Sequence, residues 1–131
     1  LTKPCKLKML GKGYLFRQSN PAVFGVEVLA GELRSGTPLM KADGTKLQPV
    51  KSLQAEQESV DKAEKGKQVA VSLPKVTVGR QINENDILYS AVSEEDFRKL
   101  KGLKKYLSQE EIAILKEIAE IMRKKNPVWG I

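Results

Sequence analysis

Apolar and polar residues alternate in short runs along the first two-thirds of the chain. At Phe24, Val26 and Val28 the apolar side chains occupy every second position, which is the period of a strand with one buried face. Glycines separate such runs, and Asp43-Gly44 is typical of a two-residue hairpin turn because both central positions take a positive φ. The pattern therefore predicts an all-β segment.

Strands that recur about every ten residues favour a small closed β-barrel, since closure removes exposed sheet edges. An open sandwich is the competing architecture. Strands are expected near 50–54 and 68–73, with the acidic stretch 56–64 as a loop between them. Its carboxylates could serve metal or acid–base chemistry, but no converging partners accompany them, so a solvated loop is the favoured interpretation.

A different periodicity begins in the last third of the chain. Ser93 precedes Asp96 by three residues, and Ser108 precedes Glu111 in the same way, which is the pattern of a serine that caps the start of a helix. Apolar residues at helical spacing follow each serine. Two C-terminal helices are therefore predicted.

The second predicted helix, 109 to about 125, has a wide apolar face. Ile114, Ile118 and Ile121 form one stripe, and a second apolar stripe runs beside it. One stripe could pack on the barrel while the other stays available to a partner; alternatively, both are buried against the barrel and the first helix. Beyond the helix, Trp129 is expected to pack back onto the chain.

These patterns predict a mainly β fold that consists of a small closed β-barrel over 1–92 and a two-helix C-terminal extension over 93–131. The extension is expected to pack on the barrel. A chain of 131 residues is long enough to bury such a core.

Composition excludes several classes of function. The chain contains no histidine and a single cysteine, Cys5, so it lacks a Ser-His or Cys-His catalytic pair and the ligands of a zinc cluster. No apolar run approaches the roughly 20 residues of a membrane-spanning helix. We therefore expect a non-catalytic protein with no membrane partner, in a reducing, cytoplasmic setting.

The charge balance points to a partner class. Lys and Arg number 23 against 16 Asp and Glu, which gives a formal net charge of +7. The excess is concentrated early, since residues 1–26 hold five Lys or Arg and no acidic residue. Such an excess favours a polyanion such as nucleic acid, although a basic surface that only confers solubility is an open alternative.

Several segments resemble known translation factors. The stretches GELRSGTPL (31–39), VKSLQ (50–54) and AEKGKQVAVSL (63–73) resemble the second-domain β-barrel of translational GTPases. A sharper match is GYLFRQSNPAVFGVEVL (13–29), which resembles the fourth domain of the archaeal and eukaryotic initiation factor 5B family. The two closing helices and NPVWG (126–130) resemble the archaeal form.

The resemblance implies a parent factor that is a ribosome-dependent GTPase. The phosphate-binding motif GxxxxGK[ST] does not occur in this sequence. GTP and magnesium would therefore bind in another part of the parent factor. No cofactor and no metal are expected in this fragment, which is not itself an enzyme.

The resemblance also implies that the barrel binds the methionylated acceptor end of initiator tRNA while the ribosomal subunits join. Such a site needs cations for phosphates, flat or apolar surface for the terminal adenosine and the methionyl group, and close approach of the backbone. The candidate residues for this site are Phe16, Arg17, Asn20, Gly25, Gly66, Lys67 and Arg80.

Neighbouring candidates on one strand raise a geometric problem. Phe16 and Arg17 point to opposite faces of a regular strand, so a bulge or a division between core and site is required. For Phe16 and Phe24 a place in the barrel core is an equally good interpretation. By analogy with related barrels, residues 54–68 would form a second rim, whose acidic side chains repel phosphate unless Gly66, Lys67 and Arg80 offset them locally.

In this family the helical extension is also where the carboxy-terminal tail of initiation factor 1A docks. A groove between the helices would take aliphatic anchors from that tail, and lysines would attract its acidic residues. The candidate groove residues are Lys99, Leu100, Leu103, Lys104, Ile114, Ile118 and Ile121. The main alternative is a protein-interaction module that uses only these helices, with the barrel as a scaffold.

Overall fold

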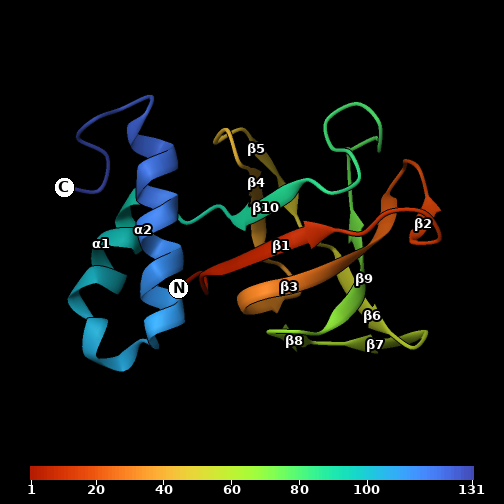
Figure 1. Ribbon diagram of the computed structural model, residues 1–131, viewed down its shortest axis with the longest axis horizontal. Helices are drawn as coiled ribbons and strands as arrows, with labels where there is room; N and C mark the ends of the chain where they lie inside the picture. Colours follow the sequence, from red (N-terminus) through yellow and green to blue (C-terminus); the bar gives the residue numbers. More distant parts are fainter.

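The computed structural model describes residues 1–131 and places a curled antiparallel sheet beside two helices (Figure 1). The strands are β1 (Cys5–Met9), β2 (Leu15–Arg17), β3 (Ala22–Arg34), β4 (Pro38–Lys41), β5 (Lys46–Pro49), β6 (Ser52–Ala55), β7 (Glu58–Val60), β8 (Lys62–Glu64), β9 (Gln68–Leu73) and β10 (Ile87–Ser90). The helices are α1 (Glu94–Gly102), the short 3₁₀ helix η1 (Lys104–Tyr106) and α2 (Gln109–Arg123). The predicted fold class, mainly β with two C-terminal helices, is confirmed.

The sheet curls into a barrel. Its hydrogen-bonded order is β5-β4-β10-β1-β3-β9-β6-β7. The chain itself links the two arms of this path, because β5 pairs with β4 and the directly following β6 pairs with β9. At the junction the Val50 amide donates to the Thr37 carbonyl and the Lys51 amide donates to the Ser72 carbonyl. The barrel is therefore completed by a bridging segment of chain rather than by one more continuous ladder.

Strand β3 is the centre of the fold, since it pairs with β1, β2, β8 and β9. Its alternating residues Phe24, Val26 and Val28 are buried in a core cluster of 18 residues inside the barrel. The hairpin predicted at Asp43-Gly44 joins β4 to β5, although only Gly44 takes a positive φ, of 87°. The alternation in the sequence thus identified both the strands and the face that they bury.

The acidic stretch 56–64 is not a loop, which corrects the expectation from the sequence. It contains β7 and β8, and β7 forms a hairpin with β6. The turn of this hairpin consists of Glu56 and Gln57, with φ values of 53° and 67°. Such a turn is usually signalled by Asn-Gly. Glu-Gln gives no turn signal, so the sequence pattern did not reveal the hairpin.

Both predicted helices are confirmed, with the predicted caps. The Ser93 hydroxyl accepts a hydrogen bond from the Asp96 amide at 3.1 Å. Ser108 and Glu111 form a reciprocal capping box. Helix α2 ends at Arg123, slightly earlier than expected. The structure contains no helix that is long and apolar enough to cross a lipid bilayer.

A second cluster of ten buried residues joins the helices to the outer face of the barrel (Figure 1). Tyr89 contributes from β10, and Ile114 and Ile118 contribute from α2. Ile121 and Met122 are half-buried against the same cluster. Both apolar stripes of α2 therefore face the protein, which is the second of the two alternatives left open by the sequence.

The end of the chain folds back onto the helices, as expected for Trp129. Its ring lies 4.8 Å from the ring of Phe97, centroid to centroid. The Arg123 guanidinium donates to the Trp129 carbonyl at 2.7 Å, and the Lys101 ammonium donates to the Gly130 carbonyl at 3.2 Å. These contacts fix the last residues against α1 and α2.

Candidate functional site

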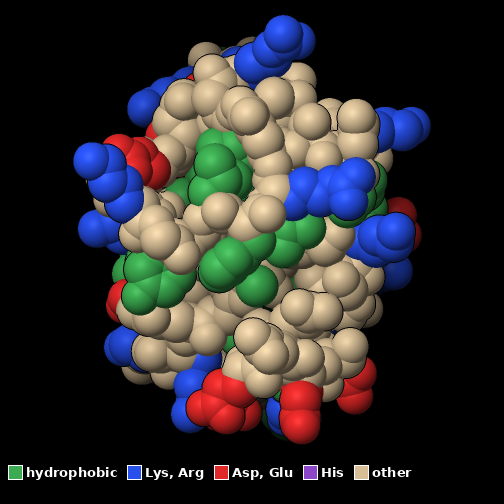
Figure 2. Space-filling model, turned by 90° about the vertical axis from the view of Figure 1, so that its right-hand side faces the viewer, with side chains coloured by type: hydrophobic (Ala, Val, Ile, Leu, Met, Phe, Trp, Pro, Cys, Tyr) green, Lys and Arg blue, Asp and Glu red, His purple; other side chains and the backbone are tan.

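A pocket of about 520 Å³ opens on the side of the barrel away from the helices. Figure 2 shows this face, where apolar side chains gather in the middle, most Lys and Arg lie along the upper and lateral edges, and most Asp and Glu lie at the lower edge. The eleven residues that line the pocket are Leu10, Tyr14, Phe16, Val23, Gly25, Gln54, Glu56, Gln57, Gln68, Val69 and Ala70. It is thus a concave surface with an apolar and a polar side.

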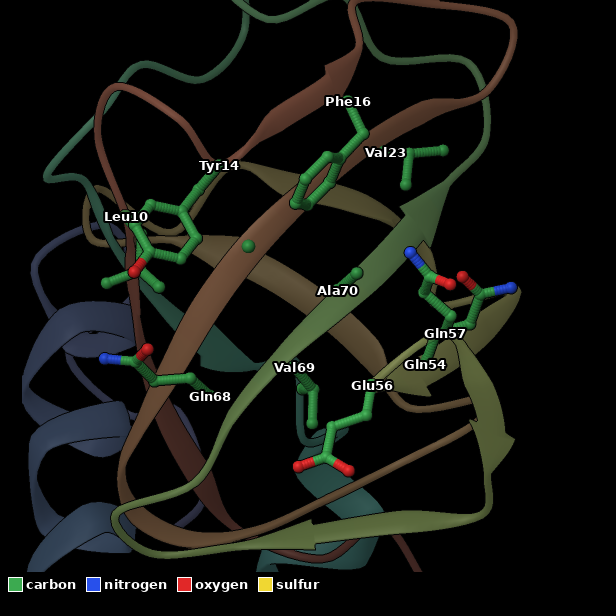
Figure 3. Close-up of a pocket in the computed structure, with 11 residues that line it drawn as sticks. Leu10, Tyr14, Phe16, Val23, Gln54, Glu56, Gln57, Gln68, Val69 and Ala70 are labelled. Atoms are coloured by element: carbon green, nitrogen blue, oxygen red, sulfur yellow. The ribbon is translucent and has the colours of Figure 1, made fainter.

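Tyr14 and Phe16 supply the aromatic part of the pocket (Figure 3). Pairing of β2 with β3 shifts register between Leu15 and Arg17, so Phe16 lies in a β-bulge, which is one of the two arrangements that the sequence left open. The Phe16 side chain is 59% exposed, whereas Phe24 is buried in the barrel core. The core interpretation is therefore confirmed for Phe24 and wrong for Phe16.

Gly25 lets the Tyr14 ring lie directly against β3. The Gly25 amide donates to the Tyr14 carbonyl at 2.7 Å. A Cβ atom at position 25 would lie only 2.9 Å from Cδ1 of Tyr14. Any side chain there would push the ring away, so glycine at this position maintains the shape of the pocket.

The polar part of the pocket comes from the β6–β7 hairpin and the start of β9. Gln54, Glu56 and Gln57 lie on one side of the close-up, and Gln68 lies on the other (Figure 3). These side chains belong to the rim that the sequence placed at residues 54–68. The rim and the aromatic wall, which are far apart in the sequence, are brought together because β6 and β3 both pair with β9.

The turn that presents Glu56 is unfavourable for its residue types. A positive φ places Cβ too close to the following carbonyl, and only glycine is free of this penalty. We expect Glu56→Gly to raise the free energy of unfolding by about 1 kcal/mol in chemical denaturation, after allowance for the greater flexibility of glycine in the unfolded chain.

The matched control for this variant is Glu58→Gly, which removes the same charge from a strand position of the same hairpin. Glycine inside a strand costs about 0.5–1 kcal/mol, so this variant should be less stable than the parent. Equal losses of stability in the two variants would show that the turn at Glu56 carries no backbone penalty.

None of the predicted cationic residues is part of the pocket lining. Arg17 is exposed on β2, where its guanidinium donates to the Ser19 carbonyl at 2.9 Å. Arg80 is exposed in the loop before β10, next to a segment whose Val78 amide donates to the Gln18 carbonyl at 3.0 Å. Both arginines therefore belong to neighbouring segments at one end of the barrel.

The remaining predicted residues occupy turns. Asn20 is exposed, has a φ of 59° and precedes a cis bond to Pro21, so it forms the turn between β2 and β3. Gly66 and Lys67 form the exposed turn between β8 and β9, directly before Gln68. Of the seven candidates from the sequence, Phe16 and Gly25 line the pocket itself.

Sequence reasoning did not identify Tyr14 and Leu10 as pocket residues. A signal existed for Tyr14, which lies two residues before Phe16, because side chains two apart in extended chain point to the same face. Gln57 lies within the rim predicted at residues 54–68, but the turn between β6 and β7 that places it in the pocket was not recognised.

The residues predicted for a groove between the helices do not form one open surface. Those buried in the second cluster are Leu100, Ile114 and Ile118, with Ile121 half-buried. Those exposed are Lys99, Leu103 and Lys104. The Lys99 ammonium lies 3.3 Å from the Glu95 carboxylate one helical turn away. The exposed part of the predicted surface is therefore the region around the end of α1 and η1.

Comparison with known proteins supports a translation factor. The family model described as elongation factor Tu domain 4 matches residues 3–89. A protein from Methanopyrus kandleri described as probable translation initiation factor IF-2 is 45% identical over 132 residues, which cover 100% of this chain and 22% of that protein. A protein of the same description from Archaeoglobus fulgidus is 44% identical over 99% of this chain and 22% of its own length.

A solved structure agrees with the sequence comparisons. The crystal structure of GDP-bound aIF5B from Aeropyrum pernix superposes with a TM-score of 0.92 and 39% sequence identity, over 99% of this chain and 22% of that chain. The chain thus spans about a fifth of these relatives. The match is to domain 4 and not to a GTPase domain, so this is a non-catalytic β domain. The chain belongs to the elongation factor Tu domain 4 family, in the form found in archaeal translation initiation factors of the IF-2/5B type.

Proposed function

We propose that this domain binds the methionylated acceptor end of initiator tRNA in the pocket between β2, β3, β9 and the β6–β7 hairpin. The observation that supports this most strongly is the pocket itself. It joins two exposed aromatic rings to the side-chain amides of three glutamines, on a face with Lys and Arg along its upper and lateral edges (Figure 2).

The two sides of the pocket suit the two parts of an aminoacyl ester. A methionyl thioether packs well against aromatic rings, and Tyr14 and Phe16 provide them. The amides of Gln54, Gln57 and Gln68 can donate to ester and ribose oxygens. Arg17 is exposed on β2 next to Phe16, and the guanidinium nitrogens other than the Nε that donates to the Ser19 carbonyl can contact a phosphate of the single-stranded end.

The wider role follows from the relatives. In a parent factor of this type, a GTPase domain outside this chain would bind GTP and magnesium. This domain would hold the charged tRNA while the factor acts on the ribosome and the subunits join. In this arrangement the GTPase domain would hydrolyse GTP, and the barrel would recognise the charged tRNA.

Titration of the domain with methionylated and uncharged initiator tRNA tests the proposal. We expect the charged tRNA to bind more tightly, and Phe16→Ala to weaken its binding about fivefold, as expected for loss of about 1 kcal/mol of aromatic contact. The control is Tyr106→Ala, which removes an aromatic side chain 72% exposed at the far side of the molecule. Equal binding of both tRNAs, or equal effects of both variants, would contradict the proposal.

A second candidate function is docking of the tail of initiation factor 1A on the helices. It is favoured by Leu103 and Tyr106, which are exposed beside Lys104 and Lys105. An apolar contact with flanking charges should depend only weakly on salt, whereas phosphate contacts depend on it steeply. Because Tyr106 would contact the tail and lies outside the tRNA pocket, Tyr106→Ala should weaken binding of this tail and leave tRNA binding unchanged.

A further inference from the structure

Glu56 is the only side chain in the pocket lining that is charged at neutral pH. The other lining residues are apolar or aromatic residues, a glycine and three glutamines. The Glu56 carboxylate has no hydrogen-bond or ion-pair partner in the structure, although six other acidic side chains form ion pairs. A single free carboxylate in a pocket that otherwise holds neutral groups is a site for one positive charge.

The backbone conformation that presents this carboxylate is unfavourable. Glu56 and Gln57 both have a positive φ, a conformation in which residues other than glycine and asparagine are uncommon. Glycine would fit the turn better but would leave the pocket without its charge. Backbone conformations of this kind are concentrated at functional sites, which supports a role for the side chain rather than for the turn.

From these observations we infer that Glu56 binds the free α-ammonium group of the aminoacyl ester and makes the site selective against N-acylated esters. This inference rests on the proposed function. An unmodified aminoacyl ester carries one positive charge beside its carbonyl, and N-acylation replaces that charge with a neutral amide. Glu56 can pair with the first group, and its carboxylate is left without a cation by the second.

The positions of Arg17 and Glu56 favour one orientation of the bound ligand. Arg17 directly follows Phe16 in β2. Across the pocket from Phe16, Glu56 lies on the β6–β7 hairpin (Figure 3). Phosphates of the acceptor strand are attracted to the arginine and repelled by the carboxylate. The ammonium group has the opposite preference, so both charges turn the ammonium group toward the β6–β7 hairpin, while the methionyl side chain stays against the aromatic rings.

The test compares initiator tRNA carrying methionine with the same tRNA carrying N-acetylmethionine. The parent domain should bind the unmodified form about fivefold more tightly, as expected for one partly exposed ion pair. Glu56→Gln should weaken binding of the unmodified form to the level of the acetylated form. Glu58→Gln, which removes an equal charge on the adjacent strand outside the pocket lining, should keep the preference. Thermal unfolding of both variants, compared with that of the parent, checks that each variant is folded.

The outcomes separate this inference from the proposed function. If the parent domain prefers charged over uncharged tRNA but binds the acetylated form equally well, the selectivity is refuted and the proposed function stands. If Glu56→Gln weakens binding of uncharged tRNA as much as binding of methionylated tRNA, Glu56 contacts the RNA and the inference is wrong. If the parent domain does not distinguish charged from uncharged tRNA, the proposed function itself fails.

Discussion

Gly31→Ala should destabilise the domain by about 2–5 kcal/mol, the sum of a left-handed backbone conformation and overpacking. Gly31 lies in β3 with a φ of 78°, where the strand passes under the start of α2. A Cβ atom at this position would collide with the Pro4 carbonyl and would lie 3.0 Å from Cδ1 of Ile114. The Gly31 amide also donates to the Glu110 carboxylate, and this hydrogen bond would be displaced.

Gly36→Ala is the control for this prediction. Gly36 has a similar φ of 88°, but no atom lies within 4 Å of its would-be Cβ. It should therefore show only the conformational penalty, about 1–2 kcal/mol. Chemical denaturation of the two variants measures the difference. Equal losses of stability would show that the junction of barrel and helix at Gly31 is not close-packed.

Alkaline pH should destabilise the fold through the buried thiol of Cys5. Burial raises the pKa of this thiol from its ordinary value of 9.0 to about 12. Between these values the unfolded chain loses the thiol proton and the folded chain keeps it. Stability is therefore complete below pH 9 and falls by about 1.4 kcal/mol per pH unit above it.

Comparison with Cys5→Ala isolates this contribution. Other groups add to the alkaline loss, because hydrogen bonding to Glu117 raises the pKa of Lys6, and burial raises the pKa of Tyr89. These groups remain in the variant. Unfolding measured from pH 8 to pH 11 under reducing conditions should give a shallower slope for Cys5→Ala than for the parent. Identical slopes would show that the Cys5 thiol does not titrate with unfolding.

The sequence was informative wherever a local pattern determines local structure. The period-two alternation in β3 and the serines before α1 and α2 predicted the strands, their buried face and both helix starts. A bulge at Phe16 was one of the two arrangements that the sequence left open, the other being a division between core and site; the structure has the bulge, and Phe16 lines the pocket while Arg17 does not. The turn at Glu56-Gln57 was not predicted from the sequence, because these residues do not favour it. The pairing of β6 with β7 and β9 imposes it.

The candidate site was also predicted only in part, because some of its residues are placed by local sequence and others by tertiary pairing. Phe16 and Gly25 were identified from a segment that resembles a known family, and the structure places both in the pocket lining. Gln57 and Glu56 reach the pocket only through the β6–β7 hairpin. For the helices, amphipathic spacing showed the apolar face of α2 but not its partner. The buried positions of Ile114 and Ile118 follow from the way the helix packs on the barrel.

The most direct measurement of the central claim is an NMR titration of the isotopically labelled domain with a hydrolysis-resistant, amide-linked analogue of 3′-methionyl adenosine. This ligand contains the aminoacyl group and the terminal nucleoside without the tRNA body. We predict amide shift changes concentrated at Tyr14, Gly25, Gln54 and Gln68, around the pocket on the barrel. Changes confined to α1 and α2, or no changes at millimolar ligand, would contradict it.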